Sequence, residues 1–506
     1  MANLFELCLA DRAGSDHLAV ETPDGVRLTY VGLVAETGRM ANALVRAGVK
    51  PGDRVAVQVE KSLANLVLYL ACLRAGAVFL PLNTAYTLPE VAYFVGDAEP
   101  SLIVCDPSVQ AGVQGLAGRA RVETLDGAGQ GSLGALAATE TAKFATVPRQ
   151  DDDLAAIVYT SGTTGRSKGA MLTHANLASN ARTLVGAWRF TGRDVLIHAL
   201  PIYHVHGLFV AINVLLLAGG TMLFLPKFDA AEILKLMPRA TTLMGVPTFY
   251  TRLLARPELT RERAAGMRLF VSGSAPLLAE THREWRARTG HAILERYGMT
   301  ETGMNVSNPY DGERIAGTVG LPLPGVEVRI ADPDTGVLLR AGRIGMIEVR
   351  GPNVFKGYWR MPERTRTEFR PDGFFITGDL GQVDARGYVS IVGRGKDMII
   401  TGGLNVYPIE VEEKIDQLPG VVESAVIGLP HPDFGEAVTA VVAVGGRPAP
   451  SEGEVLAALE QGLAGFKRPK RVVFVDELPR NTMGKVQKAA LRQEYGQLYQ
   501  GQTGAT

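Results

Sequence analysis

The sequence predicts an α/β protein with a large N-terminal domain and a small C-terminal α+β domain. From about residue 30 to 280, helical stretches alternate with short apolar runs, which is typical of helix-covered, mostly parallel sheets. Between Gly317 and Gly393, short runs broken by Gly and Pro predict hairpins and a distorted β-barrel. Strand and helix patterns follow to the C-terminus. We therefore expect domains at residues 1–393 and 394–506.

The first elements show the alternation clearly. Residues 28–49 have helical apolar spacing and end near a glycine, and residues 53–59, DRVAVQV, form a strand pattern. Residues 63–82 predict a helix followed by a strand. In the C-terminal stretch we expect a helix at 407–421, strands at 423–429 and 436–444, a helix near 452–463 and a strand at 471–478.

One uncharged segment, residues 207–226, is about long enough to span a bilayer. Asn213, the Gly219–Gly220 pair and Thr221 interrupt it. These breaks leave neither piece long enough to cross a membrane, so we predict a short core helix, a turn and a buried strand.

Charge and cysteine content exclude several classes of protein. The 506 residues include 52 basic and 52 acidic side chains, so no global field attracts nucleic acid or an anionic membrane. The cluster FKRPKR at 466–471 suits either a solvated loop or CoA phosphates. Cys8, Cys72 and Cys105 lack disulfide or C-x-x-C spacing, and the N-terminus has no apolar signal segment. A cytoplasmic protein is expected.

The stretch YTSGTTGRSKGAM, residues 159–171, has the composition of a phosphate-binding loop. Its glycines allow close backbone approach, and its hydroxyl groups can donate to an anion. It lacks the G-K-[ST] order of a P-loop NTPase. An ordinary Gly/Ser/Thr turn is the alternative that this stretch alone leaves open.

Five more motifs follow in order: VSGSAPL (271–277), ERYGMTET (295–302), FFITGDLG (374–381), GRGKDMIITGGLNVYP (393–408) and LPRNTMGKVQK (478–488). Together with the loop they resemble the adenylate-forming enzymes, which include acyl-CoA synthetases, luciferases and nonribosomal adenylation domains. The resemblance covers essentially the whole chain. LNTAYTL, ALPIYHVHGLF, SAPLLAETHREW and MNVSNPYDGER resemble malonyl-CoA synthetases in particular.

The resemblance implies a two-step reaction with ATP, Mg²⁺ and CoA. A carboxylate attacks the α-phosphorus of ATP, which yields an acyl-adenylate and diphosphate, and the CoA thiol then displaces AMP. A carboxylate is already ionised at neutral pH, so the first step needs no general base. It needs charge neutralisation and alignment.

The resemblance also implies roles for individual residues. Lys485 would be the catalytic lysine, Thr300 a phosphate contact and Glu301 the magnesium ligand. The small domain would be a mobile lid that rotates about Lys396 and brings the Gly402, Gly403 and Leu404 loop to the CoA tunnel. The ATP-binding positions would be Thr160, Ser161, Gly162, Thr163, Thr164, Gly165, Lys168, Gly273, Ser274, Ala275, Glu295, Arg296, Tyr297, Gly298, Asp379 and Arg394.

The acid is a separate inference. Malonate carries a second carboxylate, and burying it without a cation would cost several kcal/mol. The resemblance places Arg283 at that position with His206 as a helper, although Arg283 also suits the exposed face of a polar helix. His204 would be a gate residue, and a metal site at the H-x-H pair is the less favoured reading because no third ligand accompanies it.

Val205, Met299 and Met304 would line the acyl pocket. Malonyl-CoA synthetases often carry threonine at the position of Val205 and a bulkier polar residue at Gly303. These departures leave methylmalonate open as a substrate, since one methyl group is worth only about 1–3 kcal/mol.

Three rival functions remain: a carrier-protein adenylation module, a non-catalytic nucleotide binder and a long-chain fatty acyl-CoA synthetase. The first would call for an acidic residue in the acyl pocket, whereas this region offers His204, His206 and Arg283. The family's catalytic lysine is also a target of reversible acetylation. A protein acetyltransferase acting on Lys485 is therefore a possible partner.

Overall fold

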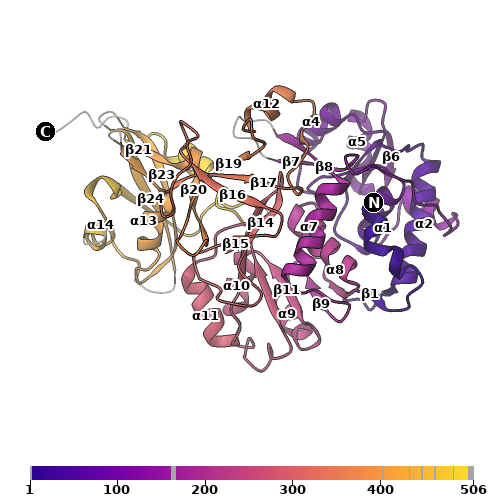
Figure 1. Cartoon of the computed structure of the whole chain (residues 1–506), viewed down its shortest axis with the longest axis horizontal. Helices are drawn as coiled ribbons and strands as arrows, with labels where there is room; N and C mark the ends of the chain where they lie inside the picture. Colours follow the sequence, from indigo (N-terminus) through magenta and orange to yellow (C-terminus); the bar gives the residue numbers. More distant parts are fainter. Residues whose placement is uncertain are drawn as a thin grey trace. The chain divides into compact units, whose positions relative to one another are not determined.

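The computed structural model describes residues 3–160, 167–401, 404–431, 434–445, 448–460, 463–481 and 484–499. The chain forms two compact units (Figure 1). The first unit comprises Met1–Val328 and Val349–Phe375, and the second Arg329–Glu348 and Ile376–Thr506. The boundary that we predict at residue 393 stays a prediction.

A nine-stranded sheet organises one part of the first unit. Its inner strands run parallel, and β2, β14 and β15 pair antiparallel at its two edges. In spatial order the strands are β15 (Leu321–Pro322), β14 (Gly303–Ser307), β13 (Leu294–Met299), β12 (Leu269–Ser272), β11 (Thr242–Gly245), β9 (Val195–His198), β10 (Thr221–Phe224), β1 (Leu18–Glu21) and β2 (Arg27–Thr29).

A second, seven-stranded sheet carries the predicted phosphate loop. Four of its strand pairings are parallel, while β8 pairs antiparallel with both of its neighbours. The order is β18 (Gly357–Tyr358), β8 (Lys168–Thr173), β7 (Leu154–Thr160), β4 (Val78–Pro81), β3 (Arg54–Gln58), β5 (Leu102–Cys105) and β6 (Arg121–Thr124).

Helices cover these sheets, as the alternation predicts. Helices α7 and α8 pack on one another and both contact α1, and Figure 1 shows them side by side. The helices of this unit are α1 (Leu4–Leu9), α2 (Tyr30–Arg46), α3 (Leu63–Arg74), α4 (Leu88–Ala98), α5 (Gln110–Leu116), α6 (Ser132–Ala138), α7 (His174–Ala187), α8 (Asn213–Ala218), α9 (Ala230–Leu236), α10 (Pro247–Leu254), α11 (Ala279–Thr289) and α12 (Pro362–Thr367).

The uncharged segment lies in the core as a helix, turn and strand, so that prediction is confirmed. A π-helical stretch, His206–Ile212, continues directly into α8. Gly219 ends α8 at φ 83°, where glycine avoids the strain of a Cβ atom, and β10 follows. No helix among the described residues is both long and apolar enough to cross a membrane.

The C-terminal part of the second unit has the α+β fold that the sequence predicts. Strands β24 and β25 run parallel, the other pairs of this sheet run antiparallel, and α13 packs against β23. The elements are β21 (Ile399–Thr401), β22 (Leu404–Val406), α13 (Pro408–Ile415), β23 (Val421–His431), β24 (Gly435–Val444), α14 (Glu452–Glu460), β25 (Arg471–Val475) and α15 (Lys488–Tyr495).

The predicted hairpin region takes the form of a four-stranded sheet that belongs largely to the second unit. Its strands pair in the order β16 (Glu327–Ala331), β17 (Gly345–Arg350), β19 (Phe375–Val383) and β20 (Val389–Arg394). The last two strands carry Asp379 and Arg394 as cross-strand partners.

Candidate active site

The phosphate-loop sequence connects two paired strands. Strand β7 ends at Thr160, β8 begins at Lys168, and these two residues are partners in the antiparallel register. The predicted contacts Ser161, Gly162, Thr163, Thr164 and Gly165 lie outside the described residues. The strands therefore place the two ends of the loop side by side.

Lys168 lies in a network of charged and hydroxyl groups. Its Nζ contacts Glu368 Oε1 at 3.0 Å and sits 4.1 Å from the centre of the Tyr358 ring. The Tyr358 hydroxyl lies 2.8 Å from Glu368 Oε2 and 3.0 Å from Glu301 Oε1, and it can donate its one proton to either carboxylate. Strand β18 brings Tyr358 here because it pairs with β8.

Glu301, the predicted magnesium ligand, is buried. Burial raises the pKa of its carboxyl group, while Tyr358 and Lys168 lower it. The Thr160 hydroxyl lies 3.4 Å from Oε1. Thr300 precedes Glu301 and is buried. Within the described residues no group of three or more His, Cys, Asp or Glu side chains could hold a metal, so Glu301 would need oxygen ligands of other kinds.

Arg296, on strand β13, is a buried cation whose guanidinium lies next to the end of strand β12. The strand ends at Ser272, and the guanidinium lies against the Gly273 backbone: a Cβ added to Gly273 would meet Arg296 Cζ at 2.3 Å. Arg296 is 4% exposed. Its Nε and Nη2 have no hydrogen-bond partner among the described residues, and burial lowers its pKa from 12.5 to about 9.

His206 flanks the same backbone segment. Its Nδ1 lies 3.3 Å from the Ser274 hydroxyl, and its Nε2 is buried without a partner in the described part of the chain. Burial holds the pKa of His206 well below its usual value, and the Arg296 charge lowers it further. Ser274 has φ 73°, a strained conformation for a residue with a Cβ atom. The neighbouring Ala275 is half-buried.

Arg283 has a different environment, because it is exposed on α11. His204 is half-buried, and its Nδ1 accepts a 3.4 Å hydrogen bond from the His206 backbone N–H. No third metal-ligating side chain joins the two histidines within the described residues.

Strand β13 and its continuation carry several predicted site residues. Glu295 and Tyr297 are buried and alternate with Arg296, so they point to the opposite face of the strand. Burial raises the pKa of Glu295 to about 8, and a hydrogen bond from the Gly317 backbone partly offsets this. Gly298 and Met299 are half-buried at the end of the strand.

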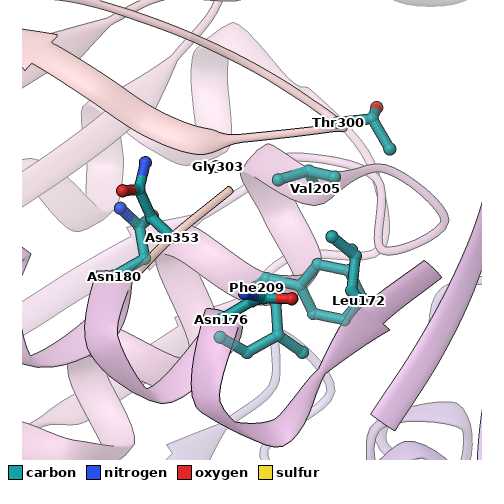
Figure 2. A pocket seen from close by; sticks show the side chains of 9 residues that line it. Leu172, Asn176, Asn180, Val205, Phe209, Thr300, Gly303 and Asn353 are labelled. Carbon is teal, nitrogen blue, oxygen red and sulfur yellow. The ribbon is translucent and has the colours of Figure 1, made fainter. Parts of the chain in front are cut away.

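A small cavity brings Val205 and Thr300 together (Figure 2). Asn180 and Asn353 lie near one another on one side of it, while Leu172 and Phe209 lie lower in the view. Asn180 bonds the backbone of buried Met304 twice, with its Nδ2 donating to the carbonyl oxygen at 2.9 Å and its Oδ1 accepting from the N–H at 3.0 Å.

Gly303 also lines this cavity and departs from the resemblance for a structural reason. Its φ is +56°, and a Cβ atom there would meet Asn180 Oδ1 at 2.7 Å. A bulkier residue at 303 would therefore require both a strained backbone and a displaced Asn180.

The second unit brings together two of the predicted nucleotide ligands. Arg394 Nε contacts buried Asp379 Oδ1 at 2.7 Å. Lys396 and Leu404 are exposed, while Gly402 and Gly403 lie outside the described residues. Lys485 is half-buried, and its backbone N–H donates to Asn481 Oδ1 at 3.0 Å.

The sequence reasoning did not identify Tyr358, Glu368, Asn180 or Phe209. Tyr358, Glu368 and Asn180 lie outside every quoted stretch. Phe209 is the last residue of ALPIYHVHGLF, but no role was predicted for it. Glu368 follows a short charged helix whose sequence is typical of a solvated surface. Strand β18, which precedes this helix, pairs with β8, and this pairing brings the segment to Lys168.

Comparison with known proteins identifies the family. Residues 9–359 match the family of AMP-binding enzymes, and residues 410–485 match the AMP-binding enzyme C-terminal domain. The crystal structure of ATP-bound MatB from Rhodopseudomonas palustris is 64% identical, has a TM-score of 0.97, and the match covers 99% of this chain and 100% of that chain.

Two curated relatives extend the comparison. A malonate–CoA ligase from Arabidopsis thaliana is 36% identical, over 97% of this chain and 88% of that protein. A feruloyl-CoA synthase from an Amycolatopsis species is 37% identical, over 95% of this chain and 97% of that protein. The chain is therefore a member of the AMP-binding enzyme family.

Proposed function

We propose that this enzyme is an ATP-dependent malonyl-CoA synthetase, an AMP-forming acid–thiol ligase. Malonate, ATP and CoA would give malonyl-CoA, AMP and diphosphate through a malonyl-adenylate. The similarity to ATP-bound MatB and to the Arabidopsis malonate–CoA ligase supports this reaction. Methylmalonate would be a second substrate.

The observation that carries the choice of acid is the buried Arg296, which the resemblance places among the ATP contacts and which we assign instead to the acid. A guanidinium that is 4% exposed, with two nitrogens lacking partners among the described residues, favours a bound anion. His206 and Ser274 lie beside it and add polar groups. A monocarboxylic acid would leave this cation unpaired, whereas the distal carboxylate of malonate would neutralise it.

The chemical steps of this proposal are those that the resemblance to adenylate-forming enzymes implies. One carboxylate oxygen of malonate forms a bond to the α-phosphorus of ATP, and the bond to the bridging oxygen of diphosphate breaks. The CoA thiol then gives up its proton to solvent, and its sulfur forms a thioester bond with the acyl carbon. The bond between that carbon and the oxygen bridging to phosphorus breaks, and AMP leaves with that oxygen. Lys485 and Thr300 would stabilise the charge that develops on the phosphate.

The ATP contacts form part of the same proposal. Residues 160–168 would hold the outer phosphates, Ala275, Tyr297 and Glu295 the base, and Asp379 with Arg394 the ribose. Glu301 and the Thr160 hydroxyl offer oxygen ligands of the kind that Mg²⁺ prefers. Bound there, the ion would neutralise phosphate charge.

The CoA contacts, the cellular location and a possible modification complete the proposal. Lys396 would be the hinge, and residues 402–404 would face the CoA arm. The three free, buried cysteines suit the cytoplasm. An acetyltransferase that neutralised Lys485 would switch off adenylation.

The test is AMP release with ATP, Mg²⁺ and CoA across malonate, methylmalonate, acetate, octanoate and mixed amino acids. We expect malonate to give the highest kcat/KM. Arg296→Gln should lower kcat/KM for malonate by about ten- to a hundredfold, the worth of one charge-assisted hydrogen bond, and change acetate turnover far less.

Arg283→Gln is the matched arginine variant. A malonate-selective loss in this variant, and not in Arg296→Gln, would move the carboxylate contact to Arg283. If acetate or octanoate equals malonate in the unmodified enzyme, malonate is not its preferred acid.

A further inference from the structure

Glu368 is the direct ion-pair partner of Lys168. It caps the C-terminal end of α12, and the Lys168 and Glu368 side chains are 10% and 16% exposed. The Tyr358 hydroxyl lies 2.8 Å from Oε2, the other carboxylate oxygen. Glu368 therefore occupies a defined position beside the one lysine of the phosphate-loop sequence.

A second cation shares the oxygen that Lys168 uses. Arg364 Nε lies 2.6 Å from Glu368 Oε1 and is 42% exposed, one helical turn earlier on α12. Glu368 would therefore keep Arg364 and Tyr358 as partners if Lys168 moved to another anion. If Lys168 moved away, the Glu368 carboxylate would therefore still be paired.

We propose that Glu368 is a positioning residue that holds the Lys168 ammonium before ATP binds and releases it to the triphosphate. Arg364 retains Glu368 after the exchange. This inference rests on the proposed function, because it takes the phosphates of ATP as the ligand of Lys168. Glu368 consequently competes with the triphosphate for one cation and also repels it, so it raises the KM for ATP.

The decisive variant is Glu368→Gln, which removes the charge and keeps the shape. The KM for ATP should fall about three- to tenfold, because the lost contact is a charge-assisted bond in a partly buried site. The kcat should not rise. The control is Glu363→Gln on the same helix, where the 81% exposed Glu363 pairs with Arg366 at the surface.

Arg364→Gln tests the same exchange in the opposite direction. With its second cation removed, Glu368 should hold Lys168 more tightly, and the KM for ATP should rise. Loss of helix stability alone would shift both variants in the same direction. If the KM for ATP falls in Glu368→Gln and rises in Arg364→Gln, a merely structural role of Glu368 does not explain the result.

Calorimetric binding of inorganic tripolyphosphate separates this inference from the proposed function. Glu368→Gln should bind tripolyphosphate more tightly than Glu363→Gln does, whichever acid the enzyme activates. The role of Glu368 would be overturned if Glu368→Gln matched Glu363→Gln in its KM for ATP and in its affinity for tripolyphosphate. It would also be overturned if Glu368→Gln bound tripolyphosphate more weakly than Glu363→Gln. Absence of malonate-dependent AMP release would overturn only the proposed acid.

Discussion

Glu295 shows how burial sets the chemistry of a single side chain. Its pKa is raised from 4.5 to about 8 by burial, so the folded protein holds this proton at pH values where the unfolded chain has lost it. The resulting stabilisation is complete below about pH 4.5 and is lost as the pH rises to about 8. The free energy of unfolding thus falls with rising pH because of this group.

Glu295→Gln tests that linkage. The variant lacks the titration, so its stability relative to the original protein should increase between about pH 4.5 and 8, by a few kcal/mol in total. Thermal unfolding midpoints of both proteins at constant ionic strength, without nucleotide, measure the difference. A difference that is the same at every pH would show that Glu295 does not carry this proton.

Arg283 and Arg296 show that the type of a residue does not by itself reveal whether the residue is buried. Arg283 and Arg296 both lie within the quoted stretches SAPLLAETHREW and ERYGMTET, and the sequence alone does not separate a buried guanidinium from a solvated one. The structure does so, because Arg296 points from a central strand onto Gly273, whereas Arg283 lies on the outer face of α11.

At the scale of elements, the π-helical stretch His206–Ile212 fixes one side of the acyl region. Its second residue, Gly207, accepts a 2.8 Å hydrogen bond from His198 Nε2, and His198 Nδ1 accepts one from Lys61. A Cβ atom at Gly207 would lie 2.0 Å from the Pro201 carbonyl oxygen. Only glycine therefore fits this close backbone approach.

Gly207→Ala should displace His206 and weaken malonate binding. Because backbone must move, we expect a loss of stability of about 1–3 kcal/mol and a raised KM for malonate. The control is Gly186→Ala in α7, where the added Cβ has open space and stability should be unchanged or raised by up to about 1 kcal/mol. Wild-type stability and KM in Gly207→Ala would contradict this account of the π-helical stretch.

At the scale of the whole molecule, the predicted catalytic groups are divided between the two units. Lys168 and Glu301 belong to the first unit, whereas Lys485, Asp379 and Arg394 belong to the second. If these residues act on one ATP molecule, adenylation requires both units. The predicted boundary at residue 393 separates Lys485 and Arg394 from Lys168 and Glu301 in the same way, but it leaves Asp379 in the large domain.

Lys485→Ala isolates the adenylation step. The rate of ATP–diphosphate exchange with malonate should fall about 10²- to 10³-fold, as for loss of a donor that stabilises developing charge. Thioester formation from supplied malonyl-adenylate should fall much less. Lys414→Ala, which removes an exposed lysine of α13, is the control; equal exchange rates in the two variants would exclude Lys485 from adenylation.

The sequence by itself determined the fold class and the order of the site motifs. Apolar periodicity marks α2, which buries one face. Continuous apolar runs mark α3 and the strands of the parallel sheets, because these elements are buried on all sides. The interrupted apolar segment at 207–226 was likewise predicted to lie in the core, and it does. Local residue types are sufficient for such features.

Only the tertiary structure decided which charged groups are buried and which are paired. Glu368 reaches Lys168 because β18 pairs with β8 across a long stretch of sequence, and Arg296 is desolvated because it packs on Gly273. Burial and pairing depend on residues that are distant in the chain. They set the charge and position of each group, and therefore the chemistry of the site.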